Sequence, residues 1–296
     1  MTETIGSEDT PGSTVGGDRV VLLGSGLGME SFDDSSLLTQ VTSGSGSVVA
    51  HDGALFLSTG LTSSSQALAR SPTTFSNFDV SIDVKFNQVA RDGTSSTFVI
   101  GAYVSSTTYC TLFIDVSPSA VELRCESVVA GVYLEDVTLL SVSGTDVHLR
   151  ALRFRSSVYF YLNGDEIFVA DWTDSPANFQ FGLVASSDRS GLRASVTSFE
   201  QNSVVWLTKD VLQSSQASQE YVVVDNIYRA TGRFDVRSPA VDKAGSYTIT
   251  VDNGTTSYDI GTPFFYGDAV DFLTITDGDD DGWGKVRVVG DSALRN

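Results

Sequence analysis

Apolar and polar residues alternate along most of this chain. The clearest run is 78–86, where five apolar residues, beginning at Phe78 and ending at Phe86, alternate with Asp79, Ser81, Asp83 and Lys85. Successive side chains of a β-strand point to opposite faces, so this pattern predicts a strand with one buried face.

The stretch 147–170, VHLRALRFRSSVYFYLNGDEIFVA, contains two such runs separated by Asn163-Gly164. A type I′ turn needs a positive φ at both central residues, and Asn-Gly meets that need best. The stretch therefore predicts a β-hairpin.

Similar alternating segments recur at spacings of roughly 8–15 residues, separated by Gly, Ser, Thr or Pro. None of them has the period of an amphipathic helix. Short strands with turn residues between them predict an all-β fold, an antiparallel jelly-roll β-sandwich followed by a second, smaller β domain. We expect a polar N-terminal arm at 1–17, a sandwich at 18–207, a Ser/Gln-rich linker at 208–219 and a small β domain at 220–296.

The net charge of −19 restricts the kinds of binding partner that we expect. A chain this acidic repels phosphate backbones, so we expect no nucleic-acid partner. The only lysines are Lys85, Lys209, Lys243 and Lys285, and the other basic residues are arginine. This Asp-rich, Lys-poor composition is either an ordinary acidic surface or the kind of surface typical of proteins from salt-loving microbes and their viruses.

The first 18 residues lack a basic segment followed by an apolar one, so no secretory signal is recognised. No run approaches the roughly 20 apolar residues that span a bilayer, and we expect no membrane insertion. By composition the arm at 1–17 lacks structure in isolation, and we expect a neighbouring subunit to hold it if it is ordered.

Five segments together resemble the laminin-G-like, concanavalin A-like lectin/glucanase superfamily. They are DGALFLSTG (52–60), FSNFDVSIDVKF (75–86), HLRALRFRSSVYFYLNGDEIFVAD (148–171), FQFGLVASS (179–187) and ASVTSFEQ (194–201). The resemblance covers about residues 19–202. It departs from the family pattern at Asp146-Val147-His148, where many members carry a tryptophan before the histidine. It implies a two-sheet jelly roll whose rim loops bind sugars or protein partners.

The glycosidases of this superfamily place an acid and a nucleophile on one strand face through Glu-x-Asp-x-x-Glu. This chain has no Glu-x-Asp, and its Glu135-Asp136 and Asp165-Glu166 pairs are adjacent residues, which point to opposite faces. It also lacks a Gly-x-Ser-x-Gly elbow, and no helical pattern follows the GSGLG at 24–28. We therefore expect no catalytic residues and no enzymatic activity.

The sequence DGDDDG at 277–282 carries the most specific chemical motif. Asp277, Asp279 and Asp281 alternate before a glycine, as in the first half of a calcium loop, and Trp283 offers a backbone carbonyl. Val288 stands where an EF-hand has glutamate, which excludes an EF-hand. The stretch is either a β-loop Ca²⁺ site or a solvated acidic turn.

Several aromatic residues are candidates for stacking on sugar rings, although a structural role is favoured for each one. They are Tyr103, Tyr109, Tyr133, Trp172 and Trp206. The glycan-binding residues themselves stay unassigned.

Cys110 and Cys125 are expected in diagonal positions on one strand face, either as a disulfide or as two buried thiols, and the lack of an export signal favours thiols. With only His51 and His148 beside them, they do not form a zinc site.

These features lead to one functional hypothesis and one alternative. The hypothesis is a non-enzymatic structural protein of a tailed-phage or haloarchaeal virus, made in the host cytoplasm and exposed on the virion as a capsid decoration, turret or tail component. It is expected to form homo-oligomers, to contact other virion proteins and to bind host-surface glycans. The alternative is a cellular carbohydrate-binding module or adhesin acting as a monomer.

Overall fold

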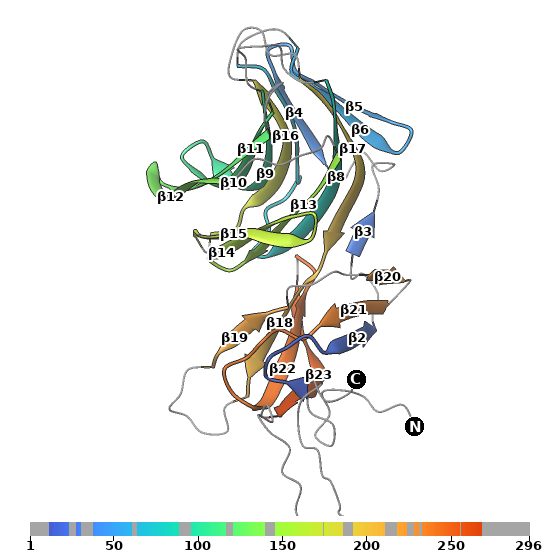
Figure 1. The fold of residues 1–296 in the computed structure, drawn as a ribbon, viewed down its shortest axis with the longest axis vertical. Coiled ribbons are helices and arrows are strands. Elements are labelled where there is room, and N and C mark those ends of the chain that lie inside the picture. Colours follow the sequence, from blue (N-terminus) through green and yellow to red (C-terminus); the bar gives the residue numbers. More distant parts are fainter. Residues whose placement is uncertain are drawn as a thin grey trace, which may run out of the picture. The chain divides into compact units, whose positions relative to one another are not determined.

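The computed structural model describes residues 12–23, 28–30, 38–60, 64–88, 96–116, 121–139, 146–173, 175–185, 192–210, 218–223, 228–230, 233–254 and 256–267. The chain forms two compact units (Figure 1). One unit is continuous, Gly28–Ser203, and the other combines Met1–Leu27 with Val204–Asn296.

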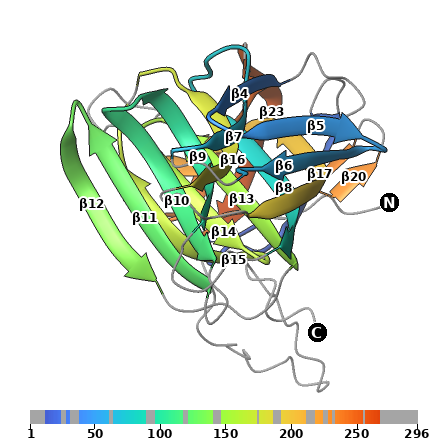
Figure 2. The same cartoon turned by 90° about the horizontal axis from the view of Figure 1, so that it is seen from above.

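The described part of the first unit consists of two sheets. A seven-stranded sheet has the order β12-β11-β10-β9-β16-β7-β4 and an eight-stranded sheet has the order β15-β14-β13-β8-β17-β6-β5, with β3 also paired to β17. Figure 2 shows β12, β11, β10 and β9 side by side. The seven-stranded sheet contains β4 (Thr39–Ser43), β7 (Gln66–Arg70), β9 (Ser96–Ser105), β10 (Thr108–Val116), β11 (Val121–Val129), β12 (Val132–Leu139) and β16 (Asn178–Ala185). The eight-stranded sheet contains β3 (Gly28–Glu30), β5 (Ser47–His51), β6 (Ala54–Ser58), β8 (Phe78–Gln88), β13 (Asp146–Phe154), β14 (Ser157–Leu162), β15 (Asp165–Asp171) and β17 (Arg193–Asn202).

The inner faces of these two sheets form one hydrophobic core. On β8, the five predicted apolar positions from Phe78 to Phe86 are all at most 4% exposed. Rings from both sheets meet in this core, for example Phe78 with Phe179 and Phe86 with Phe98, with centroids 5.8 and 5.9 Å apart. No helix occurs among the described residues, and the pairs within each sheet of this unit are antiparallel. The predicted all-β antiparallel sandwich is confirmed.

The polar face of β8 differs from a simple solvent-facing surface. Asp79 is only 1% exposed, because the guanidinium of Arg150 on the adjacent strand β13 donates to both of its carboxylate oxygens at 2.7 Å. The ion pair and its two hydrogen bonds offset the cost of burying this carboxylate. Further along the strand, His148 and Asp83 form a second cross-strand pair, with Nδ1 and Oδ1 2.7 Å apart.

The hairpin predicted at 147–170 is confirmed as strands β13, β14 and β15. Asn163 and Gly164 join β14 to β15 with φ values of 53° and 92°, as a type I′ turn requires. The turn is also fixed to β13, since the Asn163 side-chain oxygen accepts a hydrogen bond from the backbone N–H of His148 at 2.9 Å.

The second unit contains two small sheets among its described residues. One has the order β1-β23-β22-β18-β19 and the other has the order β2-β21-β20. Their strands are β1 (Gly12–Ser13), β2 (Arg19–Leu23), β18 (Val204–Lys209), β19 (Glu220–Val222), β20 (Tyr228–Ala230), β21 (Arg233–Arg237), β22 (Gly245–Asp252) and β23 (Ser257–Gly267). Its core gathers Tyr247, Val251, Phe264 and Tyr266.

The N-terminal segment belongs to this second unit, which differs from the boundaries expected from the sequence. β1 pairs in parallel with β23, and β2 pairs with β21. The sandwich thus begins at Gly28 rather than residue 18 and ends at Ser203 rather than 207, and part of the expected 208–219 linker is strand β18. In the described part of the arm, Gly12 and Ser13 pair with Tyr266 and Gly267 of the same chain.

The structure also locates the two cysteines. Cys110 lies opposite Ser127 and Cys125 lies opposite Leu112, so the two are diagonal on one face, as expected. Both are fully buried and no disulfide joins them. None of the described segments forms a helix of the length and apolarity needed to cross a membrane.

Candidate functional site

The outer face of the seven-stranded sheet, turned away from the core, carries the richest chemistry among the described residues. On β10 the residues Cys110, Leu112 and Ile114 enter the core, so the residues between them point outward. We call this surface the arginine–aromatic face. Its members are Arg70, Thr97, Tyr103, Tyr109, Thr111, Phe113, Asp115, Arg124, Glu126 and Gln180.

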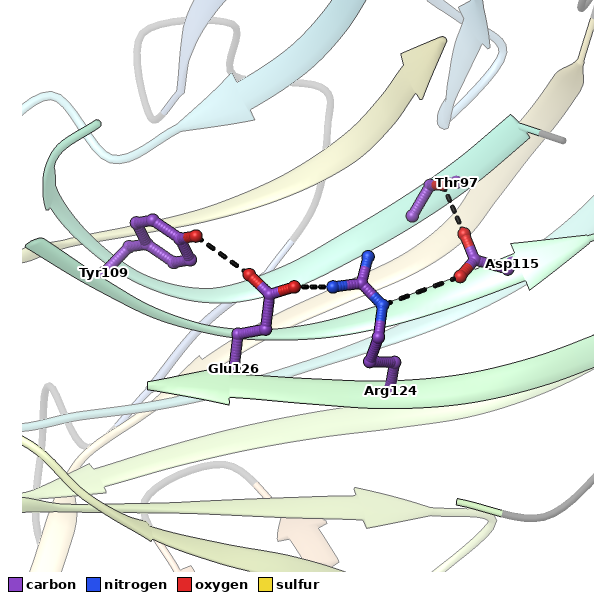
Figure 3. A network of polar contacts seen from close by, with 5 residues as sticks. All are labelled: Thr97, Tyr109, Asp115, Arg124 and Glu126. Atoms are coloured by element: carbon purple, nitrogen blue, oxygen red, sulfur yellow. Dashed lines mark hydrogen bonds and ion pairs between the residues drawn. The ribbon is translucent and has the colours of Figure 1, made fainter. Parts of the chain in front are cut away.

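One half of the face is a linear chain of polar contacts across β9, β10 and β11 (Figure 3). Arg124 forms ion pairs with Glu126 and with Asp115, the latter with Nε and Oδ2 3.9 Å apart. The Tyr109 hydroxyl donates to Glu126 at 2.8 Å, and Thr97 donates to Asp115. Arg124 therefore has two acidic partners, Glu126 and Asp115.

The same arginine also packs on an aromatic ring. The guanidinium carbon of Arg124 lies 4.3 Å from the Phe113 ring centroid. The Phe113 and Tyr109 rings meet edge to face, with centroids 6.5 Å apart. Such contacts restrain planar side chains on a sheet surface, so these groups are held in fixed orientations.

The other half of the face is built around Arg70 on β7. Its guanidinium carbon lies 3.9 Å from the ring centroid of Tyr103, which is on β9. Its Nε and Nη2 donate to Oε1 of Gln180 on β16, at 3.3 and 2.9 Å. A stacking contact and two hydrogen bonds fix the orientation of this guanidinium, although Arg70 is only half-buried.

Between the two halves the sheet carries a glycine and an unpaired hydroxyl. Gly101 lies in register between Gln180 on β16 and Thr111 on β10. Its φ is +158°, and an added Cβ would lie 2.1 Å from the Cys110 carbonyl oxygen, so only glycine fits there. The Thr111 side chain is 2% exposed, and among the described residues its Oγ1 has no hydrogen-bond partner.

A second concave region lies on the eight-stranded sheet. An open hollow of about 460 Å³ is lined by residues of β8 and β13, together with Thr197. Its ionisable residues contact each other in pairs, His148 with Asp83 and Lys85 with Asp146, the latter with Nζ and Oδ2 3.8 Å apart. None of its described lining residues is a phenylalanine, tyrosine or tryptophan. The arginine–aromatic face is therefore the better candidate for a site that stacks on a ligand.

The residues predicted as metal ligands, Asp277, Asp279, Asp281 and Trp283, lie outside the described residues. Within the described ranges, no three His, Cys, Asp or Glu side chains gather in a way that suits a metal ion.

The predicted aromatic candidates separate into two groups. Tyr103 and Tyr109 lie on the arginine–aromatic face, and Tyr133 is 60% exposed on β12. Trp172 is buried, and its Nε1 donates to the Val128 carbonyl oxygen at 3.2 Å. Trp206 is buried in the second unit.

Arg70, Gln180, Arg124 and Glu126 were not among the candidates derived from the sequence. The sequence does indicate that Arg124 and Glu126 share one strand face, because charged and apolar residues alternate along Glu122-Leu123-Arg124-Cys125-Glu126. No local pattern in the sequence indicates the contact between Arg70 and Gln180, because the two residues are 110 positions apart and meet only through the pairing of β7 with β16.

No protein-family model and no curated protein matches the chain. Among solved structures, it is similar to a Bacillus licheniformis β-glucanase at 14% identity, over 60% of this chain and 99% of the glucanase, with a TM-score of 0.46. It is similar to the carbohydrate recognition domain of Emp46p in its metal-free form at 6% identity, over 56% and 88% of the two chains, with a TM-score of 0.42.

A third similar structure is the CBM2 module of the evolved Dit of Lactobacillus casei BL23 phage J-1. Its identity is 14%, over 61% of this chain and 89% of the module, with a TM-score of 0.39. Structures like these are jelly rolls of the concanavalin A-like kind. The likenesses concern the fold, and identities this low transfer no activity or ligand to this chain.

Proposed function

We propose that the protein binds glycans, without enzymatic activity, through the arginine–aromatic face. The observation that carries this proposal is the pair of arginine–aromatic stacks, Arg70 on Tyr103 and Arg124 on Phe113, on one sheet surface. Sugar recognition combines apolar contact with aromatic rings and hydrogen bonds from planar polar groups held in fixed orientations. Both kinds of group occur on this face.

The carboxylates of the face favour binding over catalysis. A glycosidase needs one carboxyl that gives a proton to the leaving group and a second carboxylate free to act as nucleophile or base. Here both oxygens of Glu126 have partners, Tyr109 and Arg124, and both oxygens of Asp115 have partners, Thr97 and Arg124. Carboxylates held in this way serve as anchors for the arginine.

We expect this binding protein to be displayed on a virus particle as a capsid decoration, turret or tail component. The support is compositional: a net charge of −19, few lysines and an almost purely β architecture. A monomeric cellular carbohydrate-binding module is the alternative. Oligomeric state separates the two, because a virion component forms a closed ring or sits on a lattice.

Light scattering at low and multimolar salt, with and without Ca²⁺, measures the relevant mass. A discrete trimer, pentamer or hexamer supports the virion setting, and a monomer under every condition favours the cellular module. A Ca²⁺-dependent mass or stability that is lost in Asp279→Asn would locate a calcium site at 277–281.

A glycan-array screen followed by titration calorimetry tests the binding function. We expect Tyr103→Ala to weaken binding of any captured glycan about tenfold or more, because it removes the stacking ring and the support of Arg70. Tyr258→Ala is the matched control, since Tyr258 is an exposed tyrosine of the second unit. Equal loss in both variants, or no captured glycan, contradicts the proposal.

A further inference from the structure

We propose that Arg70 makes this face selective for anionic sugars, oligosaccharides that carry a carboxylate or a sulfate group. This inference rests on the proposed glycan-binding function and names the chemical class of glycan. It assigns a specificity-determining contact to one residue, Arg70 on β7.

The two arginines of the face differ in one respect. Each lies over an aromatic ring at a similar distance, 3.9 Å for Arg70 and 4.3 Å for Arg124. Arg124 has two acidic partners, Glu126 and Asp115. Arg70 forms no ion pair with any described residue, and its hydrogen-bond acceptor is the neutral amide oxygen of Gln180. Among the described residues, Arg70 therefore has no acidic partner, whereas Arg124 has two.

The geometry leaves the Arg70 guanidinium able to bind a ligand. A guanidinium has five N–H donors, and the structure shows Gln180 accepting from Nε and Nη2 of Arg70. Both N–H groups of Nη1 and the second N–H of Nη2 have no hydrogen-bond partner among the described residues, and one N–H from each of these nitrogens forms a parallel fork. Carboxylates and sulfates have paired oxygens that match such a fork, and charge-assisted bonds of this type are about twice as strong as neutral ones.

The surroundings suit a sugar rather than a bare anion. Tyr103 supplies an aromatic ring directly under the guanidinium, and Gly101, the residue in register with Gln180, contributes no side chain that would block a ring laid across the sheet. A free anion gains only the charge contact, and the net charge of −19 repels it. A sugar that carries the anion can also contact the part of the half-buried Tyr103 ring that the guanidinium does not cover.

The test uses matched probes that differ only in charge. One pair is a tetragalacturonate and its full methyl ester, and the second pair is a sulfated galactan tetrasaccharide and its desulfated form. Titration calorimetry at about 150 mM salt measures the affinity of the full-length protein for all four. We expect at least tenfold tighter binding of one anionic probe than of its neutral counterpart, and the pair that shows the difference identifies carboxylate or sulfate.

Three variants assign the selectivity to Arg70. Arg70→Gln should abolish the preference for the anionic probe while leaving the affinity for the neutral one within about twofold. Arg70→Lys should retain part of the preference, because it keeps the charge and loses the fork. Arg193→Gln is the control, an exposed arginine of β17 on the other sheet, and should change neither affinity. Melting temperatures confirm that each variant is folded.

The outcomes separate this inference from the function it rests on. Equal binding of charged and neutral probes, lost in Tyr103→Ala but unchanged in Arg70→Gln, overturns the role of Arg70 and leaves glycan binding standing. Binding of none of the four probes by the wild-type protein, together with an empty glycan array, overturns both.

Discussion

Replacing Thr111 by valine should stabilise the sandwich. The Thr111 side chain is 2% exposed, and its Oγ1 lies buried without a hydrogen-bond partner among the described residues. A buried hydroxyl that has lost its water and gained no partner costs about 1–3 kcal/mol. Valine has nearly the same shape, puts a methyl group where the hydroxyl was and suits a β-strand. The substitution should therefore raise the free energy of unfolding by about 1–3 kcal/mol.

Thr97→Val is the matched comparison, with the opposite sign expected. Thr97 lies on the adjacent strand β9 and is 8% exposed, but its hydroxyl donates to the carboxylate of Asp115. A hydrogen bond to a charged group contributes about 1.5–3 kcal/mol, so this substitution should destabilise the unit by a similar amount. The same chemical change on two neighbouring strands should thus move stability in opposite directions.

Scanning calorimetry of the full chain measures both effects. For a unit of this size, about 1–3 kcal/mol corresponds to roughly 2–12 °C in the midpoint of the transition. Thr111→Val should raise the midpoint and Thr97→Val should lower it. A decrease in both variants, or equal shifts of either sign, refutes the assignment of Thr111 as an unsatisfied buried hydroxyl.

Three further predictions concern ionisation, backbone geometry and burial. Burial raises the pKa of Tyr247 to about 12. The contribution of the neutral Tyr247 hydroxyl to the free energy of unfolding is therefore complete below pH 10 and is lost as the pH rises towards 12. Urea unfolding between pH 8 and 12 should show this loss, and Tyr247→Phe should make the loss smaller. Gly101→Ala should lower the free energy of unfolding, measured in urea, by about 2–4 kcal/mol. Gly261→Ala should lower it by less than about 1 kcal/mol, because the new Cβ would lie in open space. Cys110 and Cys125 are fully buried, so a thiol reagent should modify them only as fast as the sandwich opens; rapid reaction in the native state contradicts this burial.

Local signals in the sequence predicted the local structure well. The strand at 78–86 and the Asn163-Gly164 turn were predicted from neighbouring residues, and both predictions are confirmed. Burial of one strand face requires alternating apolar residues, and a positive φ favours Asn and Gly, so both features can be recognised in a short stretch of sequence. The diagonal offset of Cys110 and Cys125 followed from the same kind of counting.

Long-range pairing could not be predicted in the same way. The β1–β23 and β2–β21 pairs join segments more than 200 positions apart through backbone hydrogen bonds, which leave no distinctive side chain at either end. The composition of 1–17 thus predicted a segment without structure in isolation, whereas Gly12–Ser13 of that segment pairs with β23. The Arg70–Gln180 contact escaped prediction for the same reason, since only the register of β7 against β16 brings the two residues together.

The discontinuous second unit has a consequence for biosynthesis. The backbone N–H of Asp18 bonds to Ser238, 220 positions later, and Gly28 lies in register opposite Asn202, so the sandwich is an insertion whose two ends are adjacent. A ribosome adding roughly 5–20 residues per second completes the sequence of the sandwich before it adds β21, β22 and β23. The sandwich can fold during translation, whereas β1 and β2 stay unpaired until their partner strands β23 and β21 have been synthesised. Chaperone dependence during synthesis should therefore concentrate on residues 12–23, and a chain truncated before residue 233 and released from the ribosome should contain a folded sandwich and an incomplete second unit.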